Sequence, residues 1–308
     1  MSKERWGITI SDLHSGSRWG LRQPRVKHPG SGDTTLAGPV AQTLWKEWAK
    51  RVRRYSSPDF VIFGGDGVEG AQRKDGSKWL WTANVMEQAD TAIPYINSLN
   101  AGAVYGVQGT KYHVEEGGLN ADEYIMKHVT NAVDTAGGRF APPDRYIHVH
   151  GAVIHVSHKI GGTSVFQYRG TPLSRELAMN RVMSYSTEVH KANLILRGHV
   201  HHYFEVRAGV NSRCAVMPCF KARDDYAGLM HPFTWMPHLG VLVIIIKDGK
   251  VRWCEPDTFE FPQQRPELED LDEALARNGR LKGVRGRPPM PLEFPEWLQT
   301  VAPDAAEA

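Results

Sequence analysis

Two residues with metal-binding side chains stand close together near the start of the chain. Asp12 and His14 follow a short stretch, residues 7–10, in which isoleucines alternate with smaller residues. Residues two apart in a strand point to the same side, so both side chains can converge just beyond the strand. A carboxylate beside an imidazole suits Mn²⁺, Fe or Zn²⁺. Alone, an Asp-x-His pair is equally typical of a solvated loop.

Four further positions along the chain repeat this arrangement at the ends of apolar stretches. They are Gly65-Asp66, Gly109-Thr110 with His113, His158, and Gly198-His199 with His201. A single Gly-Asp or a lone histidine after a strand is usually a turn or a surface residue. Two imidazoles two apart behind a glycine have no obvious packing purpose, and five such positions in order make coincidence improbable. We therefore predict that these side chains meet at one site.

The segments between these positions alternate between strand and helix patterns. Apolar spacing predicts helices over residues 39–55, 79–99, 120–133 and 172–190. Strands are predicted at 7–10, 60–63, 103–107, 145–149, 152–157, 192–197, 203–208, 213–217, 239–247 and 250–254. Residues 15–38 show no periodicity and are predicted to be a loop over the site. Two sheets flanked by helices are the simplest α/β arrangement of these elements.

The composition is ordinary for a soluble globular protein. Of 308 residues, 23% are charged and 41% hydrophobic, and the net charge of +3 is compatible with a phosphate-bearing partner. The longest apolar run, residues 239–246, is far shorter than the roughly 20 residues of a membrane helix. The first residues do not resemble a signal peptide, and Cys214, Cys219 and Cys254 form no CxxC pair. These features predict a cytoplasmic protein with no membrane partner.

The last part of the chain differs in composition from the rest. We predict one domain over residues 1–255 and an extended tail over 256–308, rich in proline and charge, with a short helix near 268–277. Within it, Arg285-Gly286-Arg287-Pro288 matches the core of an AT-hook, an extended piece that can enter a narrow minor groove. The flanks of this motif are poor in lysine and arginine.

The ordered motifs resemble those of the calcineurin-like metallophosphoesterases, whose blocks are Asp-x-His, Gly-Asp, Gly-Asn-His, a lone His and Gly-His-x-His. Four of these five blocks match between residues 6 and 254. The resemblance implies an αββα sandwich and a centre for two divalent ions, with Mn²⁺ favoured and Fe, Zn²⁺ or Ni²⁺ as alternatives. It implies that Asp12, His14 and His201 bind one ion, that His158 and His199 bind the other, and that Asp66 bridges them.

The third block departs from the family pattern, because Thr110 stands where the asparagine ligand is expected. Thr110 could offer its hydroxyl to the second ion, or His113 could replace the asparagine. We favour His113 as the acid that protonates the leaving oxygen or as a phosphate contact. Glu69 either supports a ligand or orders its own loop. The Gly-Thr-x-x-His variant also resembles phosphoesterases of tailed phages and prophages, which implies a host cytoplasm.

The resemblance implies hydrolysis of phosphate esters by metal-bound hydroxide. We predict a phosphodiesterase or nuclease acting on nucleic acid or nucleotide diesters. The alternatives are a phosphomonoesterase acting on proteins or small molecules, and a relative that binds metal but is catalytically impaired. Candidate substrate contacts are the phosphate-binding Arg18, Arg22, Arg25, Lys27, Arg169 and Arg175, together with Tyr168 and the base-stacking Trp19.

Overall fold

The first sheet of the protein contains the strand that leads into the Asp-x-His motif. The computed structural model describes residues 4–28, 32–73, 76–162, 165–186, 189–209, 211–224 and 237–261. The sheet has the order β14-β13-β1-β4-β5. Its strands are β1 (Glu4–Ile10), β4 (Phe60–Phe63), β5 (Ala103–Gly106), β13 (Leu239–Lys247) and β14 (Lys250–Phe259). β1, β4 and β5 are parallel, and β13 pairs with β1 antiparallel.

The second sheet is built in the same way from the later part of the chain. Its order is β11-β12-β10-β9-β8. The strands are β8 (Asp144–Val149), β9 (Ala152–Ser157), β10 (Leu194–Arg197), β11 (Phe204–Arg207) and β12 (Arg213–Val216). β9, β10 and β12 are parallel to one another. Both sheets therefore have a parallel centre with antiparallel strands at an edge.

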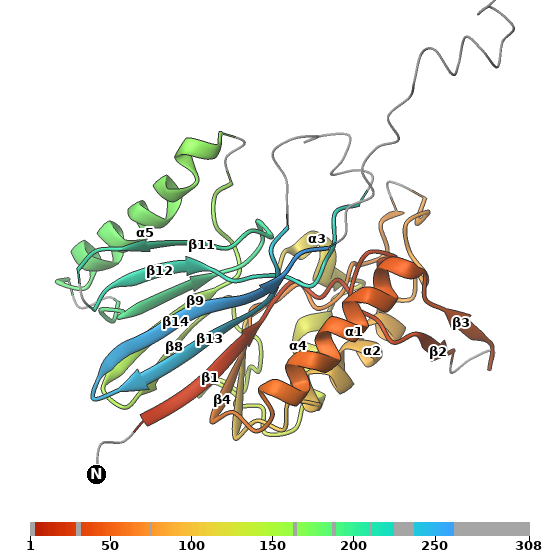
Figure 1. The fold of residues 1–308 in the computed structure, drawn as a ribbon, viewed down its shortest axis with the longest axis horizontal. Coiled ribbons are helices and arrows are strands. Elements are labelled where there is room, and N and C mark those ends of the chain that lie inside the picture. Colours follow the sequence, from red (N-terminus) through yellow and green to blue (C-terminus); the bar gives the residue numbers. More distant parts are fainter. Residues whose placement is uncertain are drawn as a thin grey trace, which may run out of the picture. The chain divides into compact units, whose positions relative to one another are not determined.

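Helices cover the outer face of each sheet, and the inner faces pack on each other. The helices are α1 (Pro39–Arg54), α2 (Val85–Asn97) and α4 (Ala121–His128) on the first sheet and α5 (Gly170–Met183) on the second (Figure 1). Ile62 of β4 and Ile244 of β13 share one buried cluster with Ile154 of β9 and Leu196 of β10. This four-layer arrangement confirms the predicted αββα sandwich.

The carboxyl ends of the parallel strands bring the predicted site residues to one edge. Ligands of open α/β sheets bind in this position. Ile10, Phe63 and Gly106 are the last residues of β1, β4 and β5, and Ser157 and Arg197 are the last residues of β9 and β10. Each of the five motif positions begins within a few residues of one of these ends.

Several predicted boundaries were wrong for local reasons. The helix predicted at 79–99 begins only at Val85, because the Asn84 side chain accepts the first backbone N–H groups. The predicted loop 15–38 contains a small hairpin, β2 (Arg25–Lys27) with β3 (Thr34–Leu36), and three residues are too few to show a period. The helix predicted at 120–133 ends at His128, and that at 172–190 ends at Met183.

Short elements complete the described part of the chain. They are α3 (Lys111–Val114), which carries His113, the hairpin of β6 (Glu115–Glu116) with β7 (Leu119–Asn120), and the 3₁₀ helix η2 (Phe166–Tyr168). Within the described ranges, no helix is long and apolar enough to cross a membrane. The predicted tail helix and the AT-hook-like motif lie outside the described residues.

Candidate metal centre

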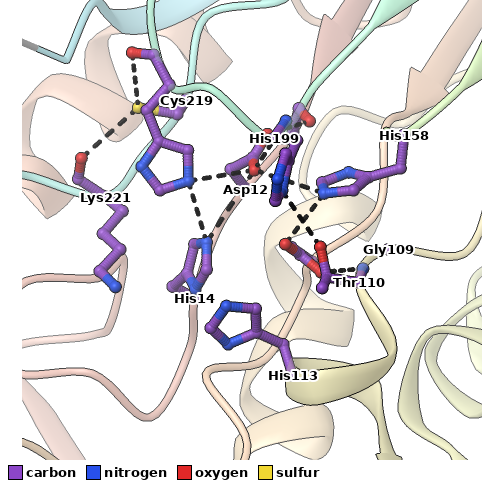
Figure 2. Close-up of polar contacts among 12 residues, drawn as sticks. Asp12, His14, Gly109, Thr110, His113, His158, His199, Cys219 and Lys221 are labelled. Atoms are coloured by element: carbon purple, nitrogen blue, oxygen red, sulfur yellow. Dashed lines mark hydrogen bonds and ion pairs between the residues drawn. The ribbon is translucent and has the colours of Figure 1, made fainter. Parts of the chain in front are cut away.

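The predicted metal ligands come together as two groups beside each other (Figure 2). Asp12, His14 and His201 form one group, and Asp66, His158 and His199 form the other. Within each group the ligand atoms lie within 4.8 Å of one another. All of these residues except His199 are at least 95% buried, since the exposed fraction of His201, the largest among them, is 5%. Apart from Asp66, which the resemblance implied as a bridge, each group has the members of one implied ligand set, and the ligand roles themselves stay predictions.

The backbone at five of these six ligands is left-handed. The φ angles are 51° at Asp12, 46° at His14, 52° at Asp66, 73° at His199 and 57° at His201. Such angles are uncommon outside glycine, although Asp and His adopt them more often than most residues. Each costs on the order of 1–3 kcal/mol and persists only where the surroundings impose it. Concentration of this strain at the ligands indicates a functional site.

In the first group, nitrogen and oxygen acceptors face one another. The Nδ1 atom of His14 lies 2.9 Å from Oε2 of Glu69, and this carboxylate favours a hydrogen on Nδ1 and a lone pair on Nε2. This Nε2 lies 3.2 Å from Nε2 of His201, which in turn lies 3.2 Å from Oδ1 of Asp12. Burial lowers the pKa of His14 to about 4, which keeps the ring neutral. A cation is the group that satisfies these converging acceptors.

The second group is arranged in the same way around His158. Its Nδ1 donates to the carbonyl oxygen of Gly64 at 2.7 Å, and its Nε2 lies 2.9 Å from Oδ2 of Asp66. Burial opposes a charge on His158, but the carboxylates of Asp66 and Asp12 outweigh burial and raise its pKa to about 10. The carboxylates around Nε2 of His158 thus attract positive charge to this position. The imidazole and carboxylate atoms of the second group are of the types that bind a divalent ion.

Asp12 lies between the two groups. Its Oδ1 is 3.2 Å from His201 Nε2 and 3.9 Å from Nε2 of both His14 and His158. Asp66 places Oδ2 against His158 and accepts the backbone N–H of Thr110 on Oδ1 at 2.6 Å. The bridging role of Asp66 stays a prediction.

The divergent third block contacts both groups. The Thr110 hydroxyl is 3.2 Å from Nδ1 of His199, which places it next to the second ligand group. A role for Thr110 as a metal ligand stays a prediction. His113 donates from Nδ1 to the backbone carbonyl of Glu69 at 2.8 Å, which leaves Nε2 available. The His113 ring packs edge-on to His14 with centroids 4.7 Å apart, and 18% of its side chain is exposed. His113 thus reaches both the centre and solvent.

The glycines of the motifs allow the backbone to approach the ligands closely. A Cβ on Gly109 would lie 2.0 Å from Oδ1 of Asp66. A Cβ on Gly198 would lie 3.0 Å from Oδ2 of Asp12 and 3.0 Å from Nδ1 of His158. A side chain at Gly109 would therefore displace Asp66, and one at Gly198 would crowd Asp12 and His158.

Two buried charged residues at the site were missed by sequence reasoning. The fully buried carboxylate of Asp122 accepts the backbone N–H groups of Asp66, Gly67 and Gly109 at 2.7–3.0 Å. Burial and the Asp66 carboxylate raise the pKa of Asp122 to about 7. Lys221, 6% exposed, lies 3.0 Å from Oε1 of Glu69. An acid in the first turn of a helix and a lysine in a loop carry no sequence signal of such roles.

The candidate substrate contacts differ in their exposure. Arg18 and Arg175 are exposed, and their substrate roles stay predictions. Arg22 is 2% exposed and donates to the carbonyl of Thr35 at 2.9 Å, so its guanidinium is engaged within the protein. Trp19 packs against another tryptophan, with ring centroids 5.2 Å apart.

Comparison with known proteins finds similarity among solved structures. No family model matches the chain, and no curated protein matches it. A predicted phosphoesterase from Streptococcus pneumoniae aligns over 84% of this chain and 94% of its own, at 12% identity and a TM-score of 0.35. Zinc-complexed Vps29 from Entamoeba histolytica aligns over 83% and 99%, at 13% identity and 0.36. NAD nucleotidase from Haemophilus influenzae aligns over 90% and 56%, at 11% identity and 0.38.

The architecture and the ligand order of the chain can be compared with what its sequence implied. Two facing five-stranded sheets flanked by helices place five ordered motif positions at one edge. Two groups of potential metal ligands form there. This is the fold and the arrangement of ligands that the resemblance to the calcineurin-like metallophosphoesterases implied.

Proposed function

We propose that the protein is a metal-dependent phosphoesterase that hydrolyses phosphodiesters of nucleic acids or nucleotides. The observation that carries this proposal is the pair of adjacent ligand groups, with Oδ1 of Asp12 within 4 Å of imidazoles from both. Imidazole and carboxylate donors suit Mn²⁺, Fe or Zn²⁺. Two bound divalent ions would stabilise the attacking and leaving oxygens of an in-line displacement and supply a nucleophilic water at neutral pH.

The protein's own residues would orient the substrate and move one proton. His113 has Nδ1 engaged with a carbonyl, so Nε2 is the atom that would donate a proton to the leaving oxygen. Beside it, Tyr112 is 49% exposed and offers a flat apolar surface on which a base can stack. The exposed Lys111 adjoins them and would attract phosphate. These neighbours support a substrate that bears both a phosphate and a ring.

The proposal is tested by comparing two chromogenic esters. Purified protein is loaded with Mn²⁺ and assayed on bis-p-nitrophenyl phosphate and on p-nitrophenyl phosphate, with chelator-treated protein as the control. We expect metal-dependent turnover with a higher kcat/KM for the diester. A higher kcat/KM for the monoester would assign the protein as a phosphomonoesterase. Metal uptake without turnover of either ester would identify a catalytically impaired relative and would contradict the proposal.

A further inference from the structure

A buried lysine, Lys221, lies beside the first ligand group. Lys221 extends alongside His14 (Figure 2). Its Nζ lies 3.0 Å from Oε1 of Glu69 and 3.1 Å from Oδ2 of Asp224. The other oxygen of Glu69, Oε2, lies 2.9 Å from Nδ1 of His14. The carboxylate of Glu69 therefore joins an internal cation to a metal ligand.

Lys221 is held in place by the backbone on either side of it as well as by its own ammonium group. The N–H of Phe220, just before it, donates to the carbonyl of Asp12 at 3.1 Å. The N–H of Ala222, just after it, donates to the carbonyl of Trp19 at 2.9 Å. The lysine is thus held against the same loop that carries Asp12 and His14.

Glu69 has a second possible role that Lys221 opposes. His14, Glu69 and His113 also bring ligand atoms within 4.8 Å of one another, which resembles a third metal site. The ammonium of Lys221 already supplies a positive charge to Glu69 at 3.0 Å. His113 turns its Nδ1–H toward the carbonyl of Glu69 and not toward an ion. The contacts therefore describe Glu69 as a hydrogen-bond acceptor.

We infer that Lys221 and Glu69 are positioning residues for His14, and this inference rests on the proposed function. Glu69 accepts the Nδ1 hydrogen and so directs the Nε2 lone pair of His14 to the metal. Lys221 neutralises Glu69 and holds its carboxylate in place, so that a buried anion neither moves toward the ion nor remains unpaired. Neither residue belongs to a ligand set implied by the motifs.

The test measures metal affinity and does not depend on turnover. Mn²⁺ is titrated calorimetrically into chelator-treated wild type, Lys221→Met, Glu69→Gln and the double variant at one pH. Loss of such a partner of a ligand typically lowers metal affinity by about 10- to 100-fold. We expect each single variant to weaken one of the two ions by that factor. Because the two residues act through one contact, the double variant should lose much less than the product of the single losses.

A matched control removes an exposed pair of the same kind. Lys50 on α1 is 63% exposed in its side chain and pairs with Glu47, so Lys50→Met should leave Mn²⁺ affinity unchanged. The d–d spectrum of Co²⁺-loaded protein gives a second measurement, since a reoriented His14 would change the spectrum of one site only. A purely structural effect would lower stability without this change.

The outcomes separate the inference from the proposed function. Wild-type affinity in folded Lys221→Met, or single losses that multiply in the double variant, would overturn the inference. If Lys221→Met does not fold, the nearly isosteric Glu69→Gln provides the test. Wild-type Mn²⁺ affinity in folded Glu69→Gln would likewise overturn the inference. Wild-type protein that binds Mn²⁺ but hydrolyses neither ester would contradict only the proposed function.

Discussion

At the scale of single residues, the bonds behind each imidazole determine which of its nitrogens faces the centre. Nδ1 of His14 lies 2.9 Å from the Glu69 carboxylate, and His158 donates from Nδ1 to the Gly64 carbonyl. Both rings therefore present Nε2 to a carboxylate or to another ring. The His14 ring, which burial keeps neutral, need not lose a proton or rotate when an ion binds, whereas His158 must give up the proton that its neighbouring carboxylates stabilise.

A residue-scale prediction concerns the carboxylate of Asp66. Asp66→Asn removes a negative charge from a position 2.9 Å from His158 and weakens the second ligand group. We expect loss of turnover and of at least one bound ion per chain, measured by metal analysis after dialysis. The control is Asp144→Asn, since 56% of the Asp144 side chain is exposed and this variant should keep wild-type turnover and metal content. A fully active Asp66→Asn enzyme would contradict both the ligand and the bridging roles.

A second residue-scale prediction concerns His113. Its contacts are to a carbonyl and to the edge of His14, so His113→Ala should leave the metal content nearly unchanged. Loss of a general acid should lower kcat about 10²- to 10⁴-fold. Paired measurements of kcat and bound Mn²⁺ check this. If one ion per chain is lost instead, His113 is a metal ligand.

The residues that sequence reasoning found and missed differ in the range of their contacts. Asp12 and His14 were predictable because a strand end and a two-residue spacing are local properties. Glu69 had two open roles, and its contacts with His14 and Lys221, which favour the support of a ligand, exist only in three dimensions. That pair is separated by 152 residues, so neither residue carries a local signal of the other.

At the scale of elements, one helix start connects the loops that follow two neighbouring strands. The Asp122 carboxylate in the first turn of α4 accepts N–H groups from the Asp66 loop after β4 and from Gly109 after β5. The Asp122 carboxylate therefore fixes the distance between the loops that carry the second and third motifs. The strands themselves were predictable from their apolar runs, but this connection between loops was not.

The element-scale prediction follows from the three hydrogen bonds of Asp122. An asparagine offers only one side-chain oxygen, so Asp122→Asn leaves one or two buried N–H groups without an acceptor. We expect the free energy of unfolding to fall by about 1–3 kcal/mol and Mn²⁺ affinity to fall with it. Urea denaturation and calorimetric titration of the same samples measure both. A variant that loses stability alone would show that the loops keep their positions without Asp122.

At the scale of the whole molecule, both sheets contribute to one centre. The first sheet supplies Asp12, His14 and Asp66, and the second supplies His158, His199 and His201. The sandwich was predictable because alternating strands and helices followed by strands allow few other arrangements. The short hairpin β2–β3 and the start of α2 were not, because their boundaries depend on two or three local hydrogen bonds.

The whole-molecule prediction concerns pH and the metal-free protein. Burial lowers the pKa of His14, His155 and His202 to about 4 each, below the ordinary value of about 6.5. The unfolded chain therefore binds more protons than the native protein between these values, and stability falls as the pH drops from 6.5 toward 4. The raised pKa values of Asp122 and His158 act in the opposite direction, but His158 binds its proton in both states below its ordinary value, so over most of this interval Asp122 alone opposes the three histidines.

We expect the free energy of unfolding to decrease by a few kcal/mol, as an order of magnitude, between pH 7 and pH 4.5. Urea denaturation with chelator present measures it. His155→Gln, which removes a titrating ring outside the metal centre, should reduce the pH dependence. Stability that stays constant or rises over this interval would show that these rings are not held neutral in the native protein.

The return of the chain to its first sheet has a consequence for biosynthesis. β1 lies between β4 and β13, so its second neighbour emerges from the ribosome only when residues 239–247 have been made. The last motif histidine, His201, is also translated long after Asp12. A nascent chain therefore cannot assemble both ligand groups before His201 has been made, and one side of β1 stays unpaired until β13 has been made. The assembly of the candidate metal centre and the closing of the first sheet thus both wait for segments far along the chain from β1.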